Sequence, residues 1–188
     1  MILVGIHGAI GAGKDVVAAW LCRHHGFVRI GMADALKDEV VEKFPRTLRA
    51  IMRLHSDSWS EPEVDLCRVV HELKPPGVRE LLQEMGTGVR RADDPDYWVK
   101  KLAGRLVDMP ATARVVVPDV RFRNEALLIQ RFSGTLVKVV RPGHDPADAA
   151  HASETSLLDW AAWDAVIRND STVAELERKA EALALTIL

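Results

Sequence analysis

Apolar and polar positions follow two kinds of pattern along the chain. Short apolar runs, several of them rich in β-branched residues, are typical of strands that are buried on both faces of a sheet. Between them lie longer amphipathic segments, whose apolar residues recur with the spacing of a helix that buries one face. The two kinds of segment follow one another in turn, which predicts an α/β sandwich with a mostly parallel central sheet flanked by helices.

The predicted strands are 1–6, 27–30, 114–117 and 135–140, with a last strand that begins at 165–167. Helices are predicted from Lys14 to a cap at Gly26, and over 33–44, 47–54, 63–73, 78–85, 95–107, 123–132 and 151–160. Thr172 and Glu175 have the spacing of a capping box before a C-terminal amphipathic helix. Segments 56–62 and 86–95 are predicted as loops, because they collect Gly, Pro, Ser and Asp. A ligand is expected at the carboxyl ends of the strands.

The segment between the first strand and the first helix is the most informative part of the sequence. Residues 4–15 read VGIHGAIGAGKD and contain a G-x-x-x-x-G-K frame. Glycines let successive N–H groups turn toward a phosphate, the helix start adds its positive dipole end, and the lysine reaches the outer phosphates. The pattern predicts a nucleotide-phosphate loop, with a structural glycine turn as the alternative. The expected phosphate-binding residues are Gly8, Gly11, Ala12, Gly13, Lys14 and Asp15.

Asp15 occupies the position where most such loops carry a Ser or Thr that ligates Mg²⁺. A carboxylate beside a polyphosphate is repelled unless a metal ion or its bound water lies between them. Two interpretations follow, and the sequence leaves both open. Either Asp15 contacts the shell of a metal ion, or it stabilises the helix start through the dipole.

Composition narrows the class of protein. The 188 residues are expected to form one domain, and the net charge of −2 gives no electrostatic reason to expect a nucleic-acid or membrane partner. No stretch approaches the roughly 20 apolar residues of a membrane span, and the N-terminus lacks the features of a signal peptide. Cys22 and Cys67 suggest reduced thiols rather than a disulfide framework. We therefore expect a cytoplasmic protein.

A second informative block, VVVPDVRFRNE, occupies 115–125. Asp119 comes just after a predicted buried strand, so it is expected at the same edge of the sheet as Lys14. Arg121 and Glu125 follow, at the start of a helix. An aspartate here can orient Mg²⁺ or its waters, and an arginine can bind a phosphate through its planar fork. The alternative is a strand-end turn with surface charges.

A third group lies on the helices in the middle of the chain. Arg79 and Gln83 are four residues apart and share a helix face, where Arg suits a phosphate and Gln suits a base edge. Gly86 and Thr87 are expected to end that helix and to approach a nucleotide closely. Trp98 has two open interpretations, a flat surface for a base or an ordinary core residue.

A phosphate loop alone does not name a function. The chain lacks the D-x-x-G and N-K-x-D motifs of switch GTPases, and its charged residues better fit phosphoryl transfer to a small acceptor. Lys37 opens the helix after the second strand, a usual place for a group that holds the acceptor phosphate, although a solvated helix face is the alternative. Arg90 and Arg91 are interpreted as a solvated charged pair.

Taken together, these motifs resemble the bacteriophage deoxynucleoside monophosphate kinases along nearly the whole chain. The motifs that carry the resemblance are G-x-x-G-A-G-K-D, A-D-A-L-K-D, R-E-L-L-Q-x-x-G-T, D-x-x-Y-W-V-K, V-V-P-D-V-R-F-R-N-E, V-V-R-P-G, H-A-S-E and N-D. The family places an aspartate after the loop lysine, so Asp15 departs only from the general pattern. The resemblance implies a P-loop nucleoside monophosphate kinase-like three-layer sandwich, with an acceptor-binding helical region at about 33–107 and a lid-like segment at about 141–154.

The resemblance also implies that the γ-phosphate of ATP passes to a deoxynucleoside 5′-monophosphate, with Mg²⁺. Lys14, Arg79, Arg121 and Arg141 are the expected catalytic residues, with Arg141 arriving on a closing lid. The expected metal ligands are Asp15 and Asp119. Acceptor binding is assigned to Lys37, Arg79, Gln83, Gly86, Thr87, Trp98, Asp119, Arg121 and Glu125. For His151, Ser153 and Glu154, a role on the ATP side and an ordinary helix start both remain open.

Two other functions remain as alternatives. The first is another small-molecule P-loop kinase, such as one that acts on dephospho-coenzyme A. The second is a non-catalytic regulator that binds a nucleotide without turnover. The sequence leaves open which bases are accepted, whether ribonucleotides are excluded, and whether the chain forms a homodimer.

Overall fold

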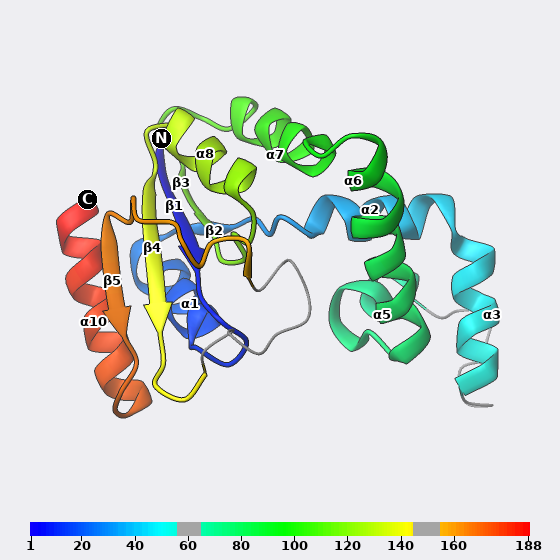
Figure 1. Cartoon of the computed structure of the whole chain (residues 1–188), viewed down its shortest axis with the longest axis horizontal. Helices are drawn as coiled ribbons and strands as arrows, with labels where there is room; N and C mark the ends of the chain where they lie inside the picture. Colours follow the sequence, from blue (N-terminus) through cyan, green and yellow to red (C-terminus); the bar gives the residue numbers. More distant parts are fainter. Residues whose placement is uncertain (56–64, 145–154) are drawn as a thin grey trace. The chain divides into compact units, whose positions relative to one another are not determined.

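Five parallel strands form one sheet in the order β2-β3-β1-β4-β5. They are β1 (Ile2–His7), β2 (Val28–Arg29), β3 (Arg114–Val117), β4 (Thr135–Val140) and β5 (Ala165–Arg168). The computed structural model describes residues 1–55, 65–144 and 155–188 (Figure 1). β1 lies at the centre of the sheet, because it pairs with β3 on one side and with β4 on the other. The segment that follows β1 therefore leaves from the middle of the sheet.

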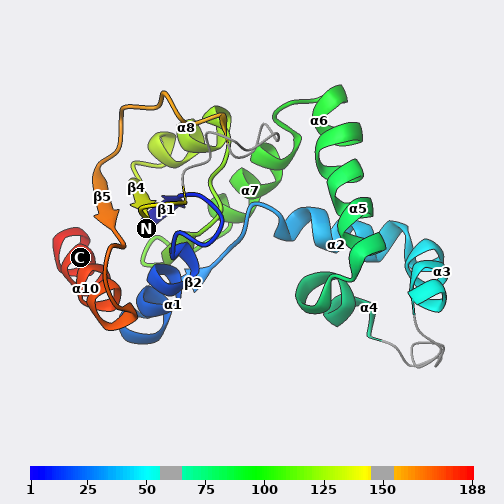
Figure 2. The same ribbon diagram turned by 60° about the horizontal axis from the view of Figure 1, so that its bottom comes forward.

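Helices cover both faces of the sheet (Figure 2). They are α1 (Lys14–His25), α8 (Arg123–Arg131) and α10 (Val173–Ile187). α1 and α10 pack on the face that carries Val4. The opposite face belongs to α8, since a Cβ on Gly5 would lie 2.8 Å from Ile129 Cγ1. Successive side chains of a strand point to opposite faces, so both faces of β1 are buried. The predicted three-layer α/β sandwich is confirmed.

The chain divides into two compact units, Met1–Gly31 with Ala103–Leu188 and Met32–Leu102. The first unit holds the sheet. The second unit is helical and contains α2 (Asp34–Lys43), α3 (Pro45–His55), α4 (Leu66–Arg68), the π-helical segments η2 (Val69–Leu73) and η3 (Glu84–Val89), α5 (Pro76–Gln83), α6 (Arg90–Asp93) and the first part of α7 (Tyr97–Val107). Its apolar core consists of Val40, Leu48, Met52, Val69, Val70, Val78 and Met85. This unit overlaps the region of about 33–107 expected to bind an acceptor, and that role stays a prediction.

Most of the predicted elements are confirmed. All five strands are present, and those at 114–117 and 135–140 have the predicted bounds. Gly26 caps α1 in a left-handed conformation with φ 65°, and the Thr172 side chain accepts a hydrogen bond from the Glu175 N–H at 3.2 Å. Cys22 and Cys67 are both free. Within the described ranges, every helix is too short or too polar to cross a membrane.

Two predictions of local structure were wrong. The segment 86–95 is mostly helical rather than a loop, because α5 continues directly into η3 and α6. Of the helix predicted over 151–160, residues 151–154 lie outside the described residues, and 156–159 form a turn. The hydrogen bonds there run from Leu158 to Thr155 and from Trp160 to Leu157, which is the three-residue spacing of a turn.

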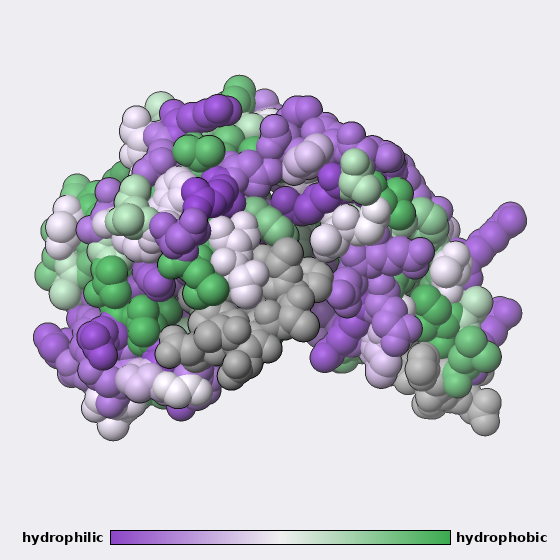
Figure 3. All heavy atoms as spheres, in the orientation of Figure 1, coloured by the Kyte–Doolittle hydropathy of each residue, from purple (hydrophilic) through white to green (hydrophobic). Residues whose placement is uncertain are grey.

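The outer edge of the sheet is formed by β5. Apolar side chains gather on the surface over β5 and α10 (Figure 3), and Val166 is 56% exposed there. A hollow of about 480 Å³ runs between β5 and α10. None of the site residues predicted from the sequence lines this hollow.

Candidate functional site

The glycine loop, residues 8–13, joins the end of β1 to the start of α1. Gly11 and Gly13 have φ values of 76° and 104°, which L-residues with a side chain rarely adopt. Gly13 is also the N-cap of α1, and its carbonyl accepts from Val17 N at 3.2 Å, which starts the helix. The first N–H groups of a helix cannot pair with carbonyls of a preceding turn. At the start of α1, these groups and the positive end of the helix dipole lie next to the glycine loop.

Two glycines of the loop are closely packed by neighbouring elements. A Cβ on Gly8 would lie 2.4 Å from the Val139 carbonyl oxygen, which is a backbone atom of β4. A Cβ on Gly13 would lie 2.7 Å from Leu176 Cδ2 on α10. The loop is thus a backbone cradle at a helix N-terminus, and its geometry fits a phosphate group.

Replacement of Gly8 by Ala is expected to destabilise the protein by about 1–3 kcal/mol and to distort the loop, because the Val139 carbonyl cannot yield without disturbing the sheet. Urea unfolding measures the loss. The matched control is Gly104→Ala on α7, where a Cβ meets nothing within 4 Å and alanine is the better helix former. If Gly8→Ala unfolds like wild type, the close packing at Gly8 is refuted.

Two basic residues that were predicted to be catalytic contact the glycine loop. Lys14 Nζ donates to the Ala9 carbonyl at 2.8 Å, and Arg141 Nη1 donates to the Gly11 carbonyl at 3.1 Å. Arg141 comes directly after β4 and is exposed, so its guanidinium reaches the loop from a neighbouring strand. The structure thus brings Lys14 and Arg141 to the same loop, where both charges suit a polyphosphate. Residues 145–154 of the predicted lid, which include His151, Ser153 and Glu154, lie outside the described residues.

The two predicted metal ligands lie in the unit that holds the sheet. The Asp15 side chain is 86% exposed, and its Oδ1 lies 4.0 Å from Arg29 Nη2. Asp119 is half-buried and follows β3. The described ranges contain no cluster of three or more His, Cys, Asp or Glu residues that suits a metal ion. Mg²⁺ in kinases is held by one or two carboxylates together with phosphate oxygens, so this donor set fits such an ion.

The turn after β3 is fixed by hydrogen bonds on both sides. Val120 N donates to the Ile6 carbonyl at 3.1 Å, and His7 Nδ1 donates to the Val120 carbonyl at 2.9 Å. His7 is buried, and its ring stacks on Trp163 at 5.2 Å between centroids. The turn therefore holds Asp119, next to Val120, at the end of the central strand. His7 was not predicted, because a single histidine at a strand end gives no signal in the sequence.

Glu125 fixes the other end of this turn. Its side chain is 1% exposed, and Oε2 accepts from the backbone N–H groups of Arg121 at 2.7 Å and Phe122 at 3.1 Å. The carboxylate thus caps the start of α8 and positions the backbone of Arg121. Its predicted contact with the substrate stays a prediction, whereas the capping contact is a structural role that the sequence analysis missed.

In the helical unit, the predicted acceptor-binding cations already have partners. Lys37 Nζ donates to Asp34 Oδ1 at 2.9 Å, one turn earlier on α2. Arg79 Nε donates to the Lys74 carbonyl at 2.7 Å. Arg79 is exposed on α5, where Gln83 is exposed four residues later, as the predicted shared face requires. Thr87, in η3, is half-buried.

Gly86 and Trp98 pack together in the interior of the helical unit. Trp98 is 3% exposed, and its Nε1 donates to the Gly86 carbonyl at 2.9 Å. A Cβ on Gly86 would lie 2.8 Å from Leu36 Cδ2, so glycine here lets the Leu36 side chain pack closely and does not end a helix. The prediction that Gly86 ends the helix was wrong. The burial of Trp98 supports the core interpretation over a surface for a base.

Arg90 was wrongly interpreted as a solvated charge. Its Nε donates to Glu39 Oε1 at 2.9 Å, and its guanidinium lies 5.2 Å from the centre of the Tyr97 ring. Glu39 is 6% exposed and also accepts from Tyr97 Oη at 2.7 Å and Lys43 Nζ at 3.0 Å. Burial alone raises the pKa of Glu39, but the hydrogen bonds from Tyr97, Lys43 and Arg90 together lower it to about 2. This ionised cluster joins α2, α6 and α7.

Sequence comparisons point to one family. The profile of the deoxynucleotide monophosphate kinase family matches residues 55–180, a range that does not include the glycine loop. A protein of Acanthamoeba polyphaga mimivirus, provisionally described as a deoxynucleotide monophosphate kinase, is 30% identical over 183 residues, which cover 93% of this chain and 92% of that protein. The deoxynucleotide monophosphate kinase of Enterobacteria phage T4 is 34% identical over 105 residues, which cover 54% of this chain and 43% of the phage enzyme.

Two solved structures share the fold. The dephospho-CoA kinase from Campylobacter jejuni aligns with a TM-score of 0.53 at 16% identity, over 98% of this chain and 96% of that one. A gluconokinase from Sinorhizobium meliloti 1021 aligns with a TM-score of 0.51 at 17% identity, over 99% and 93% of the two chains. At these identities the likeness concerns the fold alone, which is that of the P-loop kinases.

Proposed function

Because the chain belongs to the deoxynucleotide monophosphate kinase family, we propose that it transfers the γ-phosphate of ATP to a deoxynucleoside 5′-monophosphate. The products are the deoxynucleoside diphosphate and ADP. The observation that carries this proposal is the glycine loop at the start of α1, with Lys14 and Arg141 both donating to its carbonyls. The loop lies outside the range matched by the family profile, so it is separate support for phosphate binding.

On the ATP side, the backbone from Gly8 to Lys14 holds the phosphates. Its N–H groups and the dipole of α1 favour negative charge, and the Lys14 ammonium reaches the outer phosphates. Arg141, beside Gly11, adds a second cation that neutralises charge as the γ-phosphate leaves. Asp15 and Asp119 would hold Mg²⁺ or its waters, and the ion would neutralise negative charge on the phosphates.

On the acceptor side, cations hold the phosphate of the monophosphate substrate. Lys37 and Arg79 of the helical unit and Arg121 after β3 are assigned to this role. Gln83 and Thr87 contact the base and sugar, while Gly86 and Trp98 support the same helix from the interior. The reaction needs no covalent intermediate, because phosphoryl transfer depends on alignment and charge neutralisation.

Replacement of Arg79 by Ala is expected to raise the KM for the monophosphate by about 10-fold or more, since it removes a charged hydrogen-bond donor. The KM for ATP should change by less than about 2-fold. Steady-state kinetics with each substrate varied in turn measures both values. Arg68→Ala is the matched control, because Arg68 is an exposed arginine on α4 that pairs with Glu72. An unchanged monophosphate KM would remove Arg79 from the site.

The proposed function is tested by ADP release from Mg-ATP with dTMP, dGMP, dCMP, dAMP and their ribose counterparts. Turnover with one or more deoxynucleoside monophosphates establishes the reaction and names the accepted bases. Turnover with dephospho-coenzyme A instead would identify another small-molecule kinase. ATP binding without acceptor-dependent turnover would identify a nucleotide-binding regulator, and would contradict the proposal.

A further inference from the structure

Asn169 joins the end of β5 to the glycine loop. Its Nδ2 donates to the Ala12 carbonyl at 2.9 Å, although the two residues are 157 positions apart in the sequence. Its backbone N–H donates to the Val140 carbonyl at 2.8 Å, which continues the pairing of β5 with β4. The backbone of Asn169 is therefore fixed by the sheet, and its side chain is directed to the loop.

Asn169 also lies against the start of α1. A Cβ on Gly13 would meet Asn169 Nδ2 at 2.8 Å and Leu176 Cδ2 at 2.7 Å. The amide thus contacts the two residues that precede Lys14, at the point where the chain takes the left-handed conformation of Gly13. Ala12 is fully buried, so its carbonyl is costly to leave without a donor.

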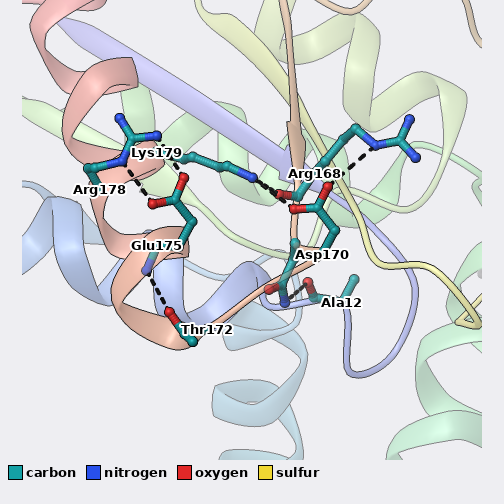
Figure 4. A network of polar contacts seen from close by, with 8 residues as sticks. Ala12, Arg168, Asp170, Thr172, Glu175, Arg178 and Lys179 are labelled. Atoms are coloured by element: carbon teal, nitrogen blue, oxygen red, sulfur yellow. Dashed lines mark hydrogen bonds and ion pairs between the residues drawn. The ribbon is translucent and has the colours of Figure 1, made fainter.

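Lys179 on α10 holds the residues on both sides of Asn169 (Figure 4). Its Nζ donates to the Arg168 carbonyl at 2.6 Å and to Asp170 Oδ1 at 3.0 Å. Arg168 Nε lies 3.9 Å from Asp170 Oδ2, which closes the turn around the carboxylate. Figure 4 shows these contacts leading from α10 through the turn after β5 to Ala12. One lysine therefore limits the movement of the turn that carries Asn169.

We propose that Asn169, held in place by Lys179, is a positioning residue that sets the backbone of the glycine loop for the phosphates of ATP. This inference rests on the proposed function. The Asn169 amide keeps the Ala12 carbonyl turned away from the phosphate side, so that the N–H groups at the start of α1 stay directed toward the ligand. A carbonyl that rotated toward the phosphates would repel them.

The test replaces the amide by groups of nearly the same shape. Asn169→Leu keeps the branched outline and removes the donor, and Asn169→Asp replaces the donor by a second acceptor that faces the Ala12 carbonyl. Both variants are expected to raise the KM for ATP by about 10-fold, with the larger effect for Asp, because loss of a donor to a buried carbonyl has this magnitude. The KM for the monophosphate should stay within about 2-fold of wild type.

Lys179→Met is expected to raise the KM for ATP by a smaller factor, because Lys179 acts on the loop only through the turn. Combining it with Asn169→Leu should add little to the effect of Asn169→Leu alone, since the lysine acts through the asparagine. Arg178→Gln is the matched control, because the neighbouring Arg178 pairs with Glu175 on the same helix at 2.7 Å (Figure 4). It should leave the KM for ATP unchanged.

Hydrogen–deuterium exchange of the nucleotide-free protein gives a readout that does not need activity. Peptides covering residues 8–18 should exchange faster in Asn169→Leu than in wild type or Arg178→Gln. Unchanged exchange in these peptides, or an unchanged KM for ATP in both asparagine variants, would overturn the inference. Failure of the wild-type protein to bind Mg-ATP in a calorimetric titration would instead overturn the proposed function. The exchange data would then still decide whether Asn169 fixes the loop.

Discussion

Replacement of Lys14 by Met is expected to lower kcat/KM by about 10²- to 10³-fold, because it removes a positive charge from the phosphates during transfer. Methionine keeps the aliphatic stem, which packs close to Gly8 in the glycine loop. The loss should therefore fall on the chemistry rather than on the fold. Coupled ADP release measures turnover, and thermal unfolding checks that the protein remains folded.

The control for this variant is Lys100→Met, since Lys100 is an exposed lysine on α7 that pairs with Asp94 at 2.7 Å. It should retain the activity of wild type. The hydrogen bond from Lys14 to the Ala9 carbonyl is also lost in Lys14→Met, and this loss is expected to cost about 1.5–3 kcal/mol of stability. Wild-type turnover in folded Lys14→Met would show that the loop does not bind the transferred phosphate.

The local parts of the site were predictable from the sequence. The glycine loop, Lys14 and the strand before them lie within a few residues, and each backbone requirement appears as a glycine or an apolar run. Asp119 was placed at the edge of the sheet for a similar reason, because it follows a β-branched run directly. Structure that depends on residues close together in the sequence can be predicted, because the residue types themselves show it.

The contacts that the sequence did not reveal join distant residues. Asn169 meets Ala12 across 157 positions, and Arg90 meets Glu39 across 51 positions. The residues next to Arg90 in the sequence give no sign that its guanidinium pairs with the buried carboxylate of Glu39. Gly86 was misinterpreted for the same reason, since glycine commonly ends a helix and its close contact with Leu36 inside a helix is a tertiary contact.

The two units also differ in how their charges are used. In the unit that holds the sheet, Lys14 and Arg141 each donate to a carbonyl of the glycine loop. Both hydrogen bonds are made to uncharged backbone groups of the loop. In the helical unit, Arg90 and Lys43 converge on one buried carboxylate and support the fold. The charges around Glu39 thus contribute to the stability of the helical unit, whereas the hydrogen bonds of Lys14 and Arg141 hold these two side chains at the glycine loop.

Replacement of Glu39 by Gln is expected to lower the free energy of unfolding by about 3 kcal/mol at pH 7, because Arg90 and Lys43 lose their shared carboxylate. The pKa of Glu39 lies at about 2 in the folded protein, below its ordinary value of 4.5. A lowered pKa stabilises the protein above pH 4.5, and this contribution disappears as the pH falls toward 2. The difference between wild type and Glu39→Gln should therefore shrink to about half at pH 3.

Urea unfolding at pH 7, 4 and 3 measures this difference, and hydrogen exchange in peptides from α2 reports on the helical unit by itself. Glu80→Gln on α5 is the control, because Glu80 is exposed in the same unit and its replacement should change little at any of these pH values. A difference between wild type and Glu39→Gln that is the same at pH 3 as at pH 7 would show that folding does not lower the pKa of Glu39. The stabilisation assigned to the ion pairs of its carboxylate would then be wrong.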